Sequence, residues 1–119
     1  MSLDQTIFNK VAAHLLAQGR PSLSAIMLGV CAYRGEDGLR CAVGCLIDDA
    51  HDHEALEGYT IWDKSVGQAV KNSLGLRHLP ARTADLLGDL QHLHDLTPPE
   101  EWREGLKGLA RQYDLELTV

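Results

Sequence analysis

Residues 31–44, CAYRGEDGLRCAVG, decide the predicted fold, because they interrupt a chain that otherwise has mostly helical periodicity. Gly35-Glu36-Asp37-Gly38 is a turn signal between two short arms, which hold Cys31 and Cys41. We therefore expect a small β-hairpin at about residues 30–42. A two-stranded ribbon is only marginally stable alone, so we expect it to lie against helices.

Four amphipathic helices are predicted around this hairpin. In each of them apolar residues recur every three or four positions, which is typical of helices that face a core. Capping residues, glycines and prolines mark their ends. The predicted helices cover residues 2–18, 61–74, 80–95, and a last stretch from the boundary Thr97-Pro98-Pro99-Glu100 to about residue 112. The expected fold is mainly α (α+β): about four helices around one core, with the β-hairpin inserted after the first helix region.

Length and composition limit the classes of protein to consider. The 119 residues suffice for one domain, which we expect to span residues 1–119. A net charge of −6 disfavours a nucleic-acid partner, because binding to phosphates usually needs a basic surface. No apolar run is long enough to span a membrane. An odd cysteine count without a secretory signal indicates a cytoplasmic protein with free thiols. The oligomeric state stays open.

The three cysteines allow a metal site or small buried side chains. A zinc site would combine Cys31, Cys41 and Cys45 with His51 or His53, giving the spacing C-x9-C-x3-C-x5-H. That spacing lacks the paired Cys-x2-Cys knuckle. Free cysteine is among the most buried residue types, so the sequence favours structural cysteines and predicts no metal and no cofactor. A reactive thiol or a disulfide is the remaining alternative.

The side chains of the hairpin are candidate binding residues. Tyr33, Arg34 and Arg40 would project from it, and guanidinium groups recognise a carboxylate, a phosphate or the acidic surface of a partner. The alternative is that the two arginines form salt bridges with the acidic loop 48–57.

The end of the third predicted helix carries a second candidate group, Gln91, His94 and Asp95. His94 lies on the flank of the leucine stripe, so it is expected to be partly buried. It would act as a general base toward a cysteine, or else hold the end of the helix. The sequence contains no phosphate-binding loop, dinucleotide fingerprint or established hydrolase motif. It therefore disfavours an enzymatic function.

The pattern Cys-x-Tyr-Arg-Gly-x-x-Gly-Leu-Arg-Cys-Ala-x-Gly at residues 31–44 resembles a family of small uncharacterised proteins of bacteria and their phages. The Gln-x-x-His-Asp pattern of the same family corresponds to Gln91, His94 and Asp95. Asp48-Asp49-Ala50-His51 departs from the family, which often has a proline and a tyrosine there. The resemblance implies no activity, but it suggests that the hairpin and these three residues form one site.

The sequence favours a non-enzymatic protein-binding module, encoded by a phage or prophage and acting on a host protein, or else binding a protein of its own cell. One alternative is a cysteine-dependent hydrolase or transferase, with Cys41 or Cys45 as the nucleophile and His94 as the base. A second alternative is a zinc-stabilised structural domain.

Overall fold

Four α-helices form the framework of the protein in the computed structural model, which describes residues 1–27 and 29–119. They are α1 (Leu3–Gln18), α2 (Lys64–Leu74), α3 (Ala81–Leu96) and α4 (Trp102–Gln112). Short 3-10 turns join them: η1 (Glu36–Gly38), η2 (Gly44–Leu46), η3 (Glu54–Leu56) and η4 (Pro99–Glu101). The prediction of four helices is confirmed. None of the described helices has the length and apolar character needed to cross a bilayer.

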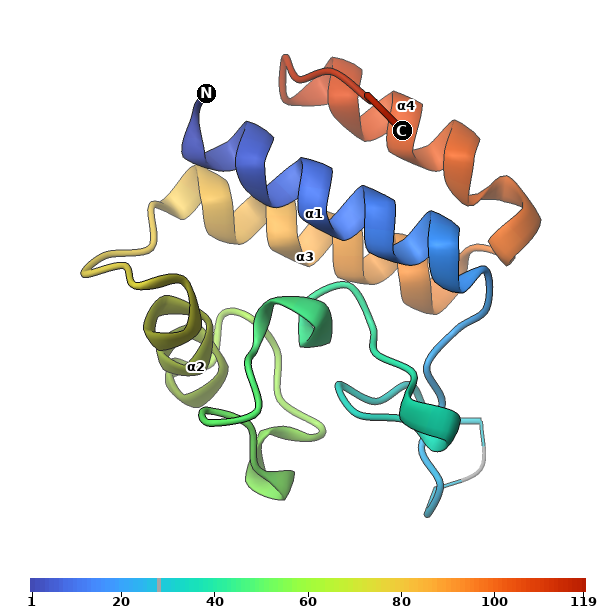
Figure 1. The fold of residues 1–119 in the computed structure, drawn as a ribbon, viewed down its shortest axis with the longest axis vertical. Coiled ribbons are helices and arrows are strands. Elements are labelled where there is room, and N and C mark those ends of the chain that lie inside the picture. Colours follow the sequence, from blue (N-terminus) through green and yellow to red (C-terminus); the bar gives the residue numbers. More distant parts are fainter. Residues whose placement is uncertain (28) are drawn as a thin grey trace.

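The helices and the irregular segments occupy two layers (Figure 1). In the first layer α1 and α3 lie side by side and run in the same direction, and α4 packs on them in the opposite direction (Figure 1). The second layer holds α2 and the long segment between α1 and α2. A side-chain amide of α1 fastens the C-terminal segment, because Gln5 donates to the Glu116 carbonyl at 2.8 Å and accepts the Glu116 N–H at 2.9 Å.

The helix ends follow from local signals. The Ser2 hydroxyl accepts the Gln5 N–H at 3.1 Å, and Gly19 ends α1 with a left-handed φ of 68°. The second helix begins later than predicted, because the Asp63 carboxylate accepts the Thr60 N–H at 2.7 Å and closes a turn before it. Residues 61–63 therefore form a turn outside the helix, and this places Trp62 in a loop.

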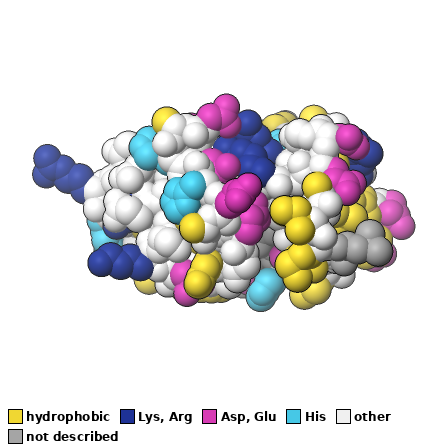
Figure 2. Space-filling model, turned by 90° about the horizontal axis from the view of Figure 1, so that it is seen from below, with side chains coloured by type: hydrophobic (Ala, Val, Ile, Leu, Met, Phe, Trp, Pro, Cys, Tyr) yellow, Lys and Arg dark blue, Asp and Glu magenta, His cyan; other side chains and the backbone are white. Residues whose placement is uncertain are grey.

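The hydrophobic core lies between the helices of the first layer and continues beneath η2. Trp102 is fully buried, and its ring stacks on that of His94 with centroids 5.6 Å apart. Val43, Leu46 and Ile47 from the second layer also reach the core. Outside the core, Ile26 and Met27 stand exposed in the loop after α1. Figure 2 shows hydrophobic side chains gathered on one part of the face seen from below.

The predicted β-hairpin at residues 30–42 is wrong. The described residues contain no β-strand, and the fold is all-α. An isolated antiparallel bridge joins Leu23 to Cys31, so Cys31 pairs with a segment before the turn and not with the opposite arm. The turn signal instead forms η1, in which Asp37 and Gly38 have positive φ angles of 56° and 73°.

The hairpin does not form because the backbone groups of its arms have partners elsewhere. The Gln18 side chain of α1 accepts the Arg40 N–H at 3.0 Å and donates to the Arg40 carbonyl at 2.9 Å. The Ser22 carbonyl accepts the Ala32 N–H at 3.0 Å. A Cβ on Gly35 would lie 2.3 Å from the Ser22 hydroxyl oxygen, so this glycine permits a close approach to the preceding segment.

Candidate functional site

A cleft of about 210 Å³ opens where α3 meets two loop segments of the second layer. Its lining combines three aromatic side chains with two carboxylates and contains no lysine or arginine. The lining residues are Cys31, Ala32, Tyr33, Cys41, Glu57, Gly58, Tyr59, Thr60, Ile61, Trp62, Gly88, Gln91, His92 and Asp95.

One carboxylate holds the two loop segments together. Glu57 accepts the backbone N–H of Tyr33 at 2.8 Å through one oxygen and that of Arg34 at 3.1 Å through the other. The Tyr33 hydroxyl also donates to the carbonyl of Tyr59. These bonds fix the wall of the cleft on the loop side.

Two large aromatic side chains lie at the rim. Tyr59 and Trp62 are each 56% exposed. A Cβ on Gly88 of α3 would lie 2.1 Å from the Trp62 ring, so the indole rests directly on the backbone of the helix. Gly88 therefore provides the place where Trp62 packs, while much of the ring stays open to a partner.

The three predicted site residues at the end of α3, Gln91, His94 and Asp95, lie together and contact the segment 22–43. His94 is buried, and its Nε2 accepts the Ser22 N–H at 2.9 Å. Its Nδ1 must therefore carry the proton, which it donates to Asp95 at 2.7 Å. Gln91 donates to the same Asp95 oxygen at 2.7 Å and accepts the Val43 N–H at 3.0 Å. These bonds tie α3 to both ends of the residue 22–43 segment.

The cleft has a negative electrostatic character. Burial alone would raise the pKa of Asp95, but hydrogen bonds from His94 and Gln91 outweigh it and hold the pKa below the usual value. Burial, followed by the nearby Asp95 charge, raises the pKa of the Cys31 thiol to about 11. Burial and then neighbouring negative groups, among them Glu57, raise the pKa of Tyr33. Asp95 is therefore ionised at neutral pH, while the thiol and the phenol are neutral.

Cys31, His94 and Asp95 are the one metal-capable group among the described residues, with ligand atoms within 4.8 Å of one another. The hydrogen bonds argue against a metal. A metal on Nδ1 would require a proton on Nε2, but Nε2 already faces the Ser22 N–H. The three residues fit a hydrogen-bonded polar network around the buried His94 better than a metal centre. In the same described part of the chain, no metal-capable cluster joins Cys41 or Cys45 to His51 or His53.

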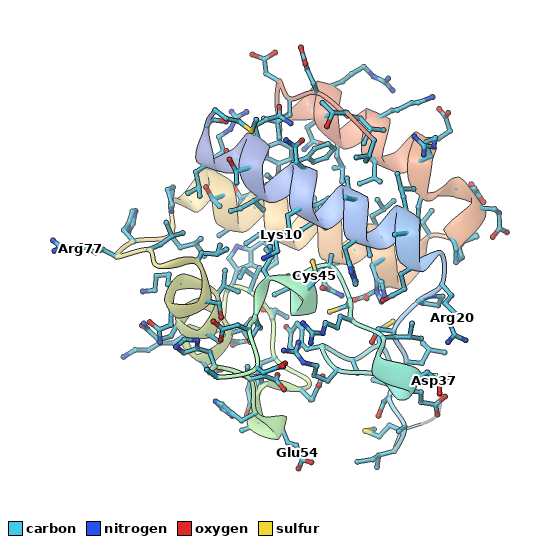
Figure 3. All side chains as sticks on the ribbon, viewed as in Figure 1. Lys10, Arg20, Asp37, Cys45, Glu54 and Arg77 are labelled. Atoms are coloured by element: carbon cyan, nitrogen blue, oxygen red, sulfur yellow. The ribbon has the colours of Figure 1, made fainter. Side chains whose placement is uncertain are left out.

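The other two cysteines, Cys41 and Cys45, lie outside the group formed by Cys31, His94 and Asp95. Cys41 is buried, which raises the pKa of its thiol. Burial raises the pKa of Cys45 to about 12, and its thiol donates to the Ala42 carbonyl at 3.1 Å. Cys45 lies beneath α1 near Lys10 (Figure 3). Because both ring nitrogens of His94 are engaged, His94 offers no free nitrogen to either thiol.

Arg34 is turned into the second layer. Its guanidinium donates to the Gly44 carbonyl at 2.8 Å and to the Ile47 carbonyl at 2.7 Å, and its side chain is only 22% exposed. It also pairs with Asp49 at 3.2 Å and with Asp52 at 3.6 Å. The guanidinium therefore links the turn after residue 44 to the acidic loop.

Arg40 shares the same acidic loop, at 3.2 Å from Asp49. The ion pairs with residues 48–57, which the sequence allowed as an alternative to projecting arginines, are present. Figure 2 shows basic and acidic side chains next to each other near the middle of the face seen from below. Neither guanidinium lines the cleft.

The sequence reasoning missed the residues that shape the cleft, namely Glu57, Tyr59, Trp62 and Gly88. Two aromatic residues close to Gly58, just before a helix and outside its apolar stripe, were the available signal.

Comparison with family models, curated proteins and solved structures finds no match for this chain. Its function therefore has to be argued from the site itself.

Proposed function

We propose that the protein is a non-enzymatic protein-binding module whose docking surface is the cleft between α3 and the 57–62 segment. The observation that carries this proposal is the pair of exposed aromatic rings at one rim, Tyr59 and Trp62. Tyrosine and tryptophan dominate the binding energy of many protein interfaces, because they bury a large apolar area at a small entropic cost.

The chemistry of the thiols favours binding over catalysis. A cysteine nucleophile needs a lowered pKa, but the pKa of each of the three thiols is raised. The imidazole of His94 is committed to the Ser22 N–H and to Asp95. The hydrolase and zinc alternatives therefore have less support than a binding site.

The proposed partner and compartment rest on the sequence. The resemblance at residues 31–44 to bacterial and phage proteins favours a phage- or prophage-encoded chain that binds a host protein. The three cysteines are free, which suits a reducing cytoplasm.

Site-specific photo-crosslinking tests the proposal. Tyr59 is replaced by p-benzoylphenylalanine, the protein is illuminated in a bacterial host lysate, and the products are identified by mass spectrometry. The control carries the same group at Ile26, which is also exposed but lies outside the cleft lining. We expect one discrete product from position 59, and we expect the additional change Trp62→Ala to abolish it. Identical products from both positions, or a product unaffected by Trp62→Ala, would refute docking at the cleft.

A further inference from the structure

The cleft is suited to a positive group. Asp95 and Glu57 bring two carboxylates to its lining, and neither lysine nor arginine is among the lining residues. His92 is the one imidazole there. Aromatic rings beside carboxylates attract cations through the ring quadrupole as well as through charge.

The hydrogen bonds already made by these two carboxylates leave one oxygen able to accept a hydrogen bond from a ligand. Both oxygens of Glu57 already accept backbone N–H groups. Asp95 receives the His94 and Gln91 hydrogen bonds on Oδ1, and no nitrogen or oxygen donor from the described residues reaches its Oδ2. The Cys31 thiol also lies beside this carboxylate, but a thiol is a weak donor, so Oδ2 has no strong donor among the described residues. A single free oxygen suits an ammonium group better than the two-pronged guanidinium of arginine.

The distance along α3 requires a long side chain. Trp62 rests on Gly88, which lies seven residues before Asp95 on the same helix, or about 10 Å along its axis. Gly88, Gln91 and Asp95 are spaced as one helix face. Side chains on a helix lean toward its N-terminus, so the Asp95 carboxylate lies closer to the Trp62 ring than this backbone separation. A side chain placed between the ring and the carboxylate needs an apolar stem and a charged tip, which lysine provides.

We propose that the cleft binds a lysine side chain in an extended segment of the partner protein, with the stem on Trp62 and the ammonium at Asp95. This inference rests on the proposed docking function, whose crosslinking test is independent of it. The negative cleft and the net charge of −6 also favour the approach of a basic segment.

Peptide titrations followed by NMR test the lysine. The probes are four acetylated and amidated heptapeptides that differ only in a central lysine, arginine, norleucine or acetyl-lysine. The readout is the indole N–H signal of Trp62. Trp102 is an internal control, because its ring is fully buried and its Nε1–H donates to the Thr97 carbonyl. We expect the lysine peptide to shift the Trp62 signal alone, with an affinity about fivefold above that of the norleucine and acetyl-lysine peptides.

Two variants complete the design. Asp95→Asn keeps an oxygen for His94 but removes the charge, so it should abolish the preference for lysine over norleucine. Trp62→Ala lacks the indole reporter, so its titrations are followed by the backbone amide signals of α3, and it should weaken binding of all four peptides. Circular dichroism checks that both variants stay folded. Equal binding of lysine and norleucine, tighter binding of arginine, or no shift with any peptide up to about 10 mM would overturn the lysine proposal. A Trp62-dependent crosslink combined with any of these results would leave the docking function standing.

Discussion

Replacing Arg34 by alanine is expected to destabilise the second layer far more than its position near the surface suggests. The guanidinium donates to the carbonyls of Gly44 and Ile47 and pairs with Asp49 and Asp52. The change removes two hydrogen bonds from a charged donor in one step, although the Gly44 carbonyl keeps the Ile47 N–H at 3.2 Å. It also leaves Asp52 without its cation, and one oxygen of that carboxylate is buried without a hydrogen-bond partner.

The expected cost is about 3 kcal/mol, from two hydrogen bonds to a charged donor at about 1.5 kcal/mol each. The unpaired Asp52 carboxylate adds to this cost. Because domains of this size are stable by about 5–15 kcal/mol, the loss is a large fraction of the total. Arg34→Lys should fall between wild type and alanine, since one ammonium does not span both carbonyls in the way a guanidinium fork does.

Urea unfolding followed by circular dichroism measures the free energy of unfolding, and Arg40→Ala is the matched control. Arg40 pairs with the same acidic loop, but its partner Asp49 is 84% exposed, so its loss should cost under about 1 kcal/mol. A cost of Arg34→Ala no greater than that of Arg40→Ala would refute the view that Arg34 holds the layer together.

Three further outcomes are expected. Gly44→Ala should destabilise the protein by at least about 2 kcal/mol in the same assay, because the added Cβ would lie 2.3 Å from the Tyr33 carbonyl oxygen; a neutral effect would contradict that close approach. Iodoacetamide labelling of Cys31 in the folded state should stay slow at pH 8 and rise only toward its pKa of about 11, as mass spectrometry of the labelled peptide can show. Because the pKa of Asp95 is lowered in the folded state, its ionised carboxylate stabilises the fold at pH values above 3.8, the ordinary pKa of the group. This stabilisation is lost as the pH falls below 3.8 and through the lower folded-state pKa. Asp95→Asn should therefore reduce the acid dependence of the free energy of unfolding, and an unchanged dependence would argue against the shift.

The helices could be predicted because their signals are local. Ser2 caps α1 and Gly19 ends it within the same stretch of sequence, and the apolar spacing identifies the face that meets the core. The second helix begins three residues after its predicted start, because Thr60 and Asp63 close a separate turn before it.

Whether the hairpin forms could not be predicted from the residues of the hairpin alone. Its turn signal was local, but the groups that capture its arms, Gln18, Ser22 and Glu57, come from before and after it in the chain. No short-range pattern encodes such partners. A β-ladder needs the backbone groups of both arms, and these partners engage enough of them to prevent it.

The candidate site was anticipated in part. Gln91, His94 and Asp95 do contact the residue 22–43 segment, whereas Arg34 and Arg40 face the acidic loop. The aromatic rim was missed because Trp62 was counted within a helix. The Trp62 ring packs on Gly88, and nothing in the sequence indicates that this glycine contacts an aromatic ring.

The Glu57 carboxylate has a consequence for the motions of the second layer. Its two oxygens hold the amide protons of Tyr33 and Arg34, so neither proton can reach solvent while the carboxylate stays in place. Swinging this one side chain away releases both protons together and loosens the wall beneath Tyr59, without any change in the helices. Hydrogen exchange at these two amides should therefore be correlated and faster than in α1 or α3, and would report how often the cleft opens.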